Sequence, residues 1–131
     1  MSANKKGTAK GAISVDQHRI EILLDIITFK EDDTTVVYCP PLEVYGYGSD
    51  ENEAQKSFKI SLAEFFRYCL NKDTLRAELK RLGWQIKRSK IKPMIPPKIT
   101  ELLSSNENLS RIYDNFDFRK TATSVTIPAV A

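Results

Sequence analysis

The sequence predicts an α+β domain in which a three-stranded antiparallel sheet is followed by an amphipathic helix and a further strand, in the order β-β-β-α-β, with a C-terminal extension. Three observations lead to this prediction. Apolar residues alternate over 20–28, a second β-prone run follows a polar turn, and apolar residues recur at helical spacing from Ala54 to Cys69. The 131 residues are 41% hydrophobic and 28% charged, which is ordinary for one globular domain.

The first two predicted strands form a hairpin. The alternation over 20–28 has the period of a strand with one buried face, and the polar run 30–33 predicts a turn. The β-branched run 34–39 predicts the second strand. Two prolines at 40–41 end that strand, because proline cannot donate a ladder hydrogen bond. A short third strand is predicted over 43–47.

A long helix follows the third strand. Asp50, with Glu53 three residues later, approximates a capping box and predicts the start of the helix. The apolar stripe then continues to about Leu70. A second, short helix is predicted over 74–82, and the residues at 84–87 alternate again as in a short strand.

These elements divide the chain into three predicted segments. Residues 1–16 are rich in lysine and small residues and predict a disordered basic arm. Residues 17–89 form the predicted α+β domain. Residues 90–131 are the predicted extension, made of a proline-rich linker, a short helix and a β-prone tail over 121–127.

Cysteine usage and the composition of the N-terminal residues indicate an intracellular protein. The net charge is +3, which is mildly basic. Cys39 and Cys69 each lie within an apolar run, and without a CxxC pair or a Cys/His cluster we expect reduced, buried thiols and no zinc. The first residues lack the apolar core of a signal peptide. We therefore expect a cytoplasmic protein with no membrane segment and no cofactor.

The candidate catalytic residues do not form a recognisable set, so we expect a binding protein and not an enzyme. His18 is the single histidine and lies at the start of a strand, where a polar edge residue is more common than a catalyst. Glu21 and Asp25 share one strand face but lie roughly 13 Å apart, too far for a pair of glycosidase carboxylates. A metal nuclease acting through Asp25 ranks last among the hypotheses.

The junction between the third strand and the helix resembles a known family. Cys39-Pro40-Pro41-Leu42, a short spacer and then Gly48-Ser49-Asp50-Glu51-Asn52-Glu53-Ala54 are similar to the signature of HicB-like antitoxins, C-P-D-L followed by G-D-T-x-E-E-A. The residues that match in kind are Cys39, Pro40, Leu42, Gly48, Glu53 and Ala54. The resemblance covers about 18–72.

The resemblance implies a fold related to part of ribonuclease H and a role in a bacterial toxin–antitoxin system. A member of this family neutralises a small HicA-like ribonuclease toxin by occlusion, so a protein partner is expected. The chain departs from the family pattern in 90–131, where no helix-turn-helix or ribbon-helix-helix is clear. Operator binding is therefore not implied.

A basic window over 76–98 provides the alternative function, a stand-alone nucleic-acid-binding regulator. Its cations could neutralise phosphates, with Trp84 in their midst. The competing interpretation, which we favour, is a solvated helix face with Trp84 in the core. The candidate nucleic-acid contacts are Arg76, Lys80, Arg81, Lys87, Arg88 and Lys90.

Two further pairs are candidate partner contacts. Tyr45 and Tyr47 share one face of the predicted third strand, where tyrosine is typical of an interface. Val125 and Ile127 lie in the β-prone tail, which would pair with the domain's own sheet, a second subunit of a homo-oligomer, or a partner's sheet. The sequence leaves these three alternatives open.

Overall fold

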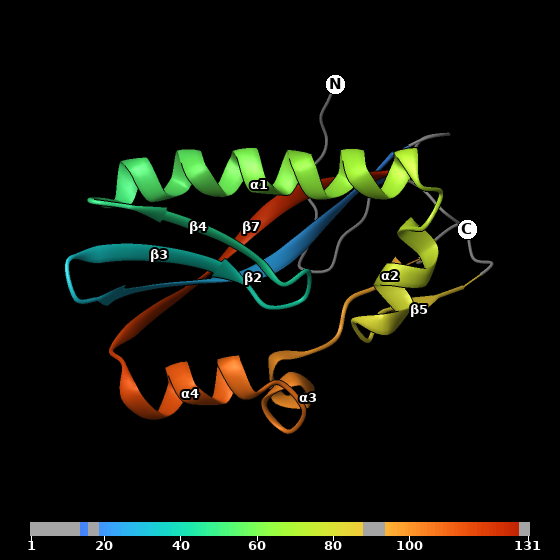
Figure 1. Ribbon diagram of the computed structural model, residues 1–131. Helices are drawn as coiled ribbons and strands as arrows, with labels where there is room; N and C mark the ends of the chain where they lie inside the picture. Colours follow the sequence, from blue (N-terminus) through green and yellow to red (C-terminus); the bar gives the residue numbers. More distant parts are fainter. Residues whose placement is uncertain (1–13, 16–18, 88–93, 129–131) are drawn as a thin grey trace.

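The computed structural model describes residues 14–15, 19–87 and 94–128 (Figure 1). The α+β architecture predicted from the sequence is confirmed. In chain order the elements are β1 (Ser14–Val15), β2 (Arg19–Glu31), β3 (Thr34–Cys39), β4 (Val44–Gly48), α1 (Glu51–Asn71), α2 (Leu75–Arg81), β5 (Gln85–Ile86), β6 (Met94–Ile95), α3 (Ile99–Leu103), α4 (Glu107–Asn115) and β7 (Phe118–Pro128).

The predicted hairpin and third strand form a continuous antiparallel meander. β2 pairs with β3 from Ile27↔Tyr38 to Glu31↔Thr34, and Asp32 occupies the connecting turn with a φ of 57°. β3 then pairs with β4 through its whole length. An aspartate tolerates this left-handed backbone better than most residues, which explains the polar turn.

The tail lies beside β2, on the side opposite β3. β7 pairs with β2 in one uninterrupted register, from Arg19↔Pro128 to Phe29↔Phe118. Of the three alternatives for the tail, the structure therefore has pairing with the domain's own sheet. The predicted extension over 90–131 supplies a strand to the sheet of the predicted domain 17–89, so the boundary between them does not separate two folding units.

The predicted disordered arm, 1–16, is described only at its end. Ser14 and Val15 form the short strand β1, which pairs with Glu21 and Ile20 of β2. At these two positions the prediction of disorder was wrong, because β2 extends beyond β3 and leaves an edge for them to join. The rest of the arm lies outside the described residues, as does His18.

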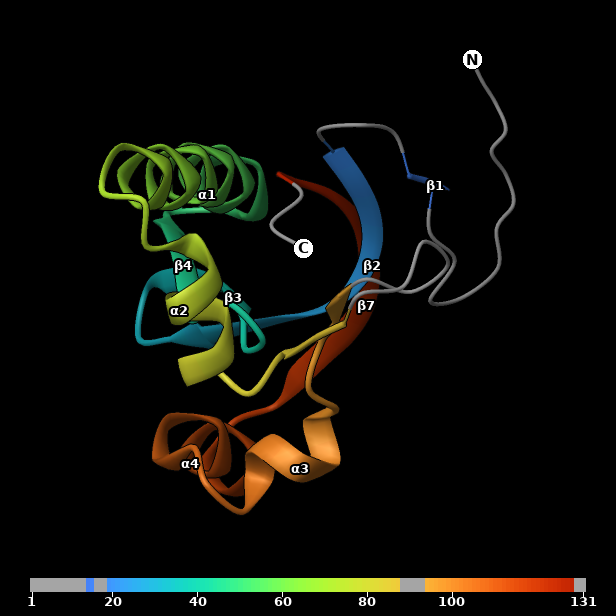
Figure 2. The ribbon, with the colours of Figure 1, turned by 90° about the vertical axis from the view of Figure 1, so that its right-hand side faces the viewer.

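Helices cover both faces of the sheet, and each face has its own buried cluster. Figure 1 shows α1 on one side of the strands and α3 and α4 on the other. The α1 face buries alternate residues of β2 together with Phe58 and Cys69. The opposite face packs Phe29 and Tyr38 against Leu109 and other residues of α3 and α4. Figure 2 shows β2 and β7 curving side by side.

Two glycines bring β4 against α1. A Cβ on Gly46 would lie 2.3 Å from the Phe58 nitrogen, and one on Gly48 would lie 2.4 Å from the Glu53 Cβ. No side chain fits at either position without moving the helix. The glycines that alternate with aromatic residues in the sequence therefore set the distance between strand and helix.

After α2 the chain turns back toward the sheet. Gly83 has a φ of 102°, a conformation that favours glycine, and it ends the helix region as predicted. β5 then pairs with β6 in a separate two-stranded ribbon. Met94–Ile95 is thus a strand within the predicted proline-rich linker. In the described ranges, no helix is both long and apolar enough to cross a membrane.

Candidate binding surfaces

The six residues of the family-like motif build the junction between β3, β4 and α1. Cys39 is fully buried at the end of β3, and its carbonyl accepts a hydrogen bond from the Leu42 backbone N–H at 3.2 Å, within the turn that contains Pro40. Burial raises the pKa of the Cys39 thiol to about 12, so this group stays protonated and unreactive. Leu42 and Ala54 are buried in the same cluster. Three of the motif residues therefore belong to the packing of this junction.

The start of α1 has a reciprocal cap. The Asp50 side chain accepts a hydrogen bond from the Glu53 backbone N–H at 2.8 Å. Glu53 Oε1 in turn accepts hydrogen bonds from the Ser49 backbone N–H at 2.9 Å and from the Ser49 hydroxyl at 2.8 Å. This return bond reaches one residue farther back than in the predicted capping box. These bonds lower the pKa of Glu53 because they stabilise its charged form.

Replacing Glu53 with glutamine tests this cap through its pH dependence. A lowered pKa in the folded state means that the charged carboxylate stabilises the fold above the ordinary pKa of 4.5, and that this stability is lost as the pH falls through the lowered value. We expect Glu53→Gln to lower the melting temperature at neutral pH, and the difference from wild type to vanish in acid. Thermal unfolding from pH 7 to pH 2 measures it; a difference independent of pH would contradict this role.

Three tyrosines stack on the face of the sheet opposite α1. The Tyr38 and Tyr45 rings lie 4.3 Å apart, and the Tyr45 and Tyr47 rings 6.0 Å apart, both nearly parallel. Exposure rises along the stack, from fully buried Tyr38 to Tyr47 at 55%. Of the two predicted partner contacts on this strand, Tyr47 is accessible, whereas Tyr45 is half-buried and its hydroxyl accepts a hydrogen bond from Asn108.

The buried end of the stack is a polar network. Asn106, the N-cap of α4, donates hydrogen bonds to the Tyr38 hydroxyl at 2.9 Å and to Glu43 Oε2 at 2.6 Å. The Tyr38 hydroxyl also donates to Glu43. Burial, together with the neighbouring Glu43, raises the pKa of Tyr38 far above its ordinary value, so the phenol stays neutral. This network fixes α4 to the β3–β4 turn.

The other pair of predicted partner contacts is buried. Val125 is 4% exposed and Ile127 is fully buried, both within the cluster on the α1 face. Their side chains are not exposed to a partner, and in this respect the prediction was wrong. The alternation of the tail indicated a covered face, but the cover is the protein's own core, which β7 joins through β2.

The structure describes four of the six predicted nucleic-acid contacts in the basic window. Arg76, Lys80, Arg81 and Lys87 are exposed. Arg81 is held by Glu78, whose carboxylate accepts hydrogen bonds from the Arg81 Nε at 3.1 and 3.2 Å. Arg81 also lies beside Glu43 in a cleft of about 520 Å³ between the β3–β4 turn and α4. The remaining two predicted contacts, Arg88 and Lys90, lie outside the described residues.

Trp84 belongs to the core. It is 4% exposed, and its indole N–H donates a hydrogen bond to the Pro41 carbonyl at 2.8 Å. This contact joins the end of α2 to the β3–β4 turn. The interpretation that we favoured, with Trp84 in the core, is thus confirmed.

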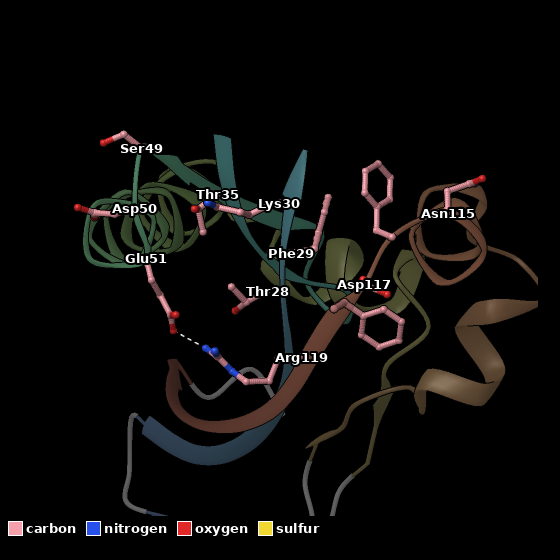
Figure 3. Close-up of a pocket in the computed structure, with 12 residues that line it drawn as sticks. Thr28, Phe29, Lys30, Thr35, Ser49, Asp50, Glu51, Asn115, Asp117 and Arg119 are labelled. Carbon is pink, nitrogen blue, oxygen red and sulfur yellow. Dashed lines mark hydrogen bonds and ion pairs between the residues drawn. The ribbon is translucent and has the colours of Figure 1, made fainter. Parts of the chain in front are cut away.

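Sequence reasoning missed a cleft of about 720 Å³ at the start of α1, where β7 leaves β2 (Figure 3). An ion pair between Arg119 of β7 and Glu51 of α1 crosses it. Beside that pair lies Thr28, the partner of Arg119 in the strand register. It is 9% exposed, and its hydroxyl oxygen has no hydrogen-bond partner within the described part of the chain. Strand pairing between distant segments forms this cleft, so no local pattern could have indicated it.

The Thr28 hydroxyl gives a stability prediction. Replacing a buried, unpaired hydroxyl with a methyl group of similar size removes a desolvation cost, so we expect Thr28→Val to stabilise the fold by about 1 kcal/mol. Thr28→Ser is the matched control, because it keeps the hydroxyl and loses a methyl, at a cost of about 0.8 kcal/mol. Chemical denaturation measures both. Destabilisation by Thr28→Val would mean that the hydroxyl has a partner.

The large apolar side chains that are exposed in the described residues lie on β4 and α1. Besides Tyr47, they are Ile60 at 64%, Tyr68 at 62% and Leu70 at 53%. The last three belong to the solvent side of α1, together with Arg67. We call Ile60, Arg67, Tyr68 and Leu70 the outer face of α1. Aromatic and arginine residues are enriched where proteins bind one another.

In the part of the chain that the structure describes, no group of three or more His, Cys, Asp or Glu side chains is arranged to hold a metal ion. No family model, curated protein or solved structure matches the chain. The choice among functions therefore depends on the surfaces described above and on the resemblance at the β3–α1 junction.

Proposed function

We propose that the chain is a HicB-like antitoxin that neutralises a small HicA-like ribonuclease toxin by covering it. The observation that supports this best is the outer face of α1, where three large apolar side chains stay more than half exposed. A helix face of this kind serves as an anchor when it becomes buried in a partner. The class of partner rests on the resemblance, whose motif residues extend from the end of β3 into the first turn of this helix.

Inhibition in this proposal is by occlusion. The motif residues Cys39 and Leu42 are buried and Glu53 is a helix cap, so they take no part in chemistry. Together with Gly46 and Gly48, which set the distance between β4 and α1, they position the helix so that it presents its outer face. A rigid surface loses little conformational entropy on binding, which favours tight association.

Co-expression with the small basic protein encoded beside this chain, if that protein carries a G-S-H loop, tests the proposal. We expect a stable complex in size-exclusion chromatography and loss of the toxin's RNA cleavage. Ile60→Lys with Tyr68→Lys should release the toxin and restore cleavage, because both charges would be buried in the interface. Thr34→Lys, at an exposed threonine on β3, is the matched control. No complex with wild type would contradict the proposal.

The second candidate is nucleic-acid binding through the basic window. The observation in its favour is that Arg76 and Lys80, four residues apart on α2, are both exposed, as is Lys87 beyond them. This candidate predicts binding of duplex DNA or RNA that weakens steeply with salt. Arg76→Ala with Lys80→Ala should weaken binding and reduce the salt slope by about 2. No binding at low salt would exclude it.

A further inference from the structure

β7 is an edge of the sheet. Its eleven residues pair with β2 on one side, and no other described strand pairs with its opposite side. Along that open side, alternate residues direct their N–H and C=O groups away from β2. Such a row of unpaired groups is a template for another strand, and proteins usually protect it.

The other long edge of the same sheet is protected. β4 has five residues, and α1 lies against it through Gly46 and Gly48. The Tyr47 backbone N–H, on the outer side of β4, donates a hydrogen bond to the Ser57 hydroxyl of α1 at 3.0 Å. The contrast shows that this fold covers the edge formed by β4 and leaves the edge formed by β7 uncovered in the described residues.

β7 lacks the usual protection against strand addition. Between Lys120 and Pro128 it has no proline and no charged residue, and its register against β2 has no bulge. Residues 119–124 are exposed, whichever face of the sheet their side chains occupy. The side chains at 121–124 are small, so a neighbouring strand would meet no obstruction on either face. Threonine pairs across strands add favourable contacts.

We propose that a second copy of this chain occupies the edge, with the two β7 strands antiparallel about a two-fold axis near Thr123. The positions of the cations support this occupant and this direction. Arg119 and Lys120 lie at one end of β7, so antiparallel pairing would place those of the two copies roughly 27 Å apart, at opposite ends of the shared ladder. Parallel pairing would place them side by side, where like charges repel.

The resulting dimer joins two sheets into one. A two-fold interface uses the same surface on both copies, so β7 must pair favourably with an antiparallel copy of itself. With the axis near Thr123, the Arg119 of one copy lies beside Ile127 of the other and Thr121 beside Val125. No like charges face each other across this ladder. The outer face of α1 is not part of it, so the dimer leaves the proposed toxin-binding surface accessible.

Sedimentation velocity of the purified full chain, without any partner, tests the dimer. We expect the mass of two copies at micromolar concentration. Ala122→Lys with Thr123→Lys should raise the dissociation constant by at least about tenfold, because lysines on an edge strand oppose pairing. Thr34→Lys is the control for an added charge on a strand, and Thr123→Val should retain the dimer. Circular dichroism establishes that each variant is folded.

Hydrogen exchange identifies what lies on the edge. In the dimer, the amides of 119–126 that point away from β2 should exchange slowly, and dilution should make them fast. A monomer at all concentrations, or a folded lysine variant that stays dimeric, would overturn the proposal. So would protection of these amides only after a HicA-like toxin is added, because the occupant would then be a partner's strand. Ile60→Lys should leave the dimer intact, which separates this test from that of the proposed function.

Discussion

Replacing Gly46 with alanine is expected to destabilise the protein by about 3 kcal/mol, because the added methyl group has no room beside α1. The Cβ would lie 2.3 Å from the Phe58 nitrogen and 2.4 Å from the Ala54 carbonyl oxygen. Both are backbone atoms of a long helix, so the methyl can be accommodated only if α1 shifts away from β4. Urea denaturation followed by circular dichroism measures the loss.

The control for Gly46→Ala adds volume where there is space. Ala63 lies on the exposed side of α1, so Ala63→Val should cost less than about 0.7 kcal/mol through helix propensity alone. Equal losses for the two variants would mean that the approach of β4 to α1 contributes little. α1 carries the proposed binding face. Gly46→Ala should therefore also weaken binding of the proposed toxin, although it adds no charge and lies outside that face.

Replacing Trp84 with alanine is expected to cost about 3–5 kcal/mol, the range for losing a large buried aromatic side chain. Trp84 is 4% exposed within the cluster that includes Leu79 and Met94. Its loss would leave a cavity between α2 and the sheet and would leave the Pro41 carbonyl without its donor. Circular dichroism in a denaturant series measures the change.

Trp84→Phe separates packing from hydrogen bonding. Phenylalanine keeps much of the ring volume but cannot donate to Pro41, so we expect a smaller loss of about 1–3 kcal/mol. The contrary outcome is a near-neutral Trp84→Ala that abolishes nucleic-acid binding. That result would make Trp84 a surface contact and would favour the second candidate function.

Local patterns predicted the elements whose signals lie within a few residues. The alternation over 20–28, the proline pair after Cys39 and the cap at Asp50 each depend on neighbouring residues, and the structure has β2, the end of β3 and the start of α1 at those places. Trp84 could also be assigned to the core, because it alternates with Ile86 after a helix stop.

Features formed by distant segments were not predictable in the same way. The alternation at Val125 and Ile127 indicated a buried face but could not say that β2 and the α1 face would cover it. The network of Tyr38 and Asn106 joins residues far apart in the chain, and so does the cleft with Arg119. The periodicity of a sequence indicates which face of a strand is buried. Which segment covers that face depends on the whole fold.

The pairing of β2 with β7 has a consequence for how the protein is made. β2 leaves the ribosome long before β7, yet the two are neighbours along eleven pairs of residues. Until β7 is synthesised, the long apolar strand β2 lacks its partner on that side. Contacts between distant segments also slow folding. The growing chain is therefore exposed to aggregation and proteolysis until β7 has been synthesised.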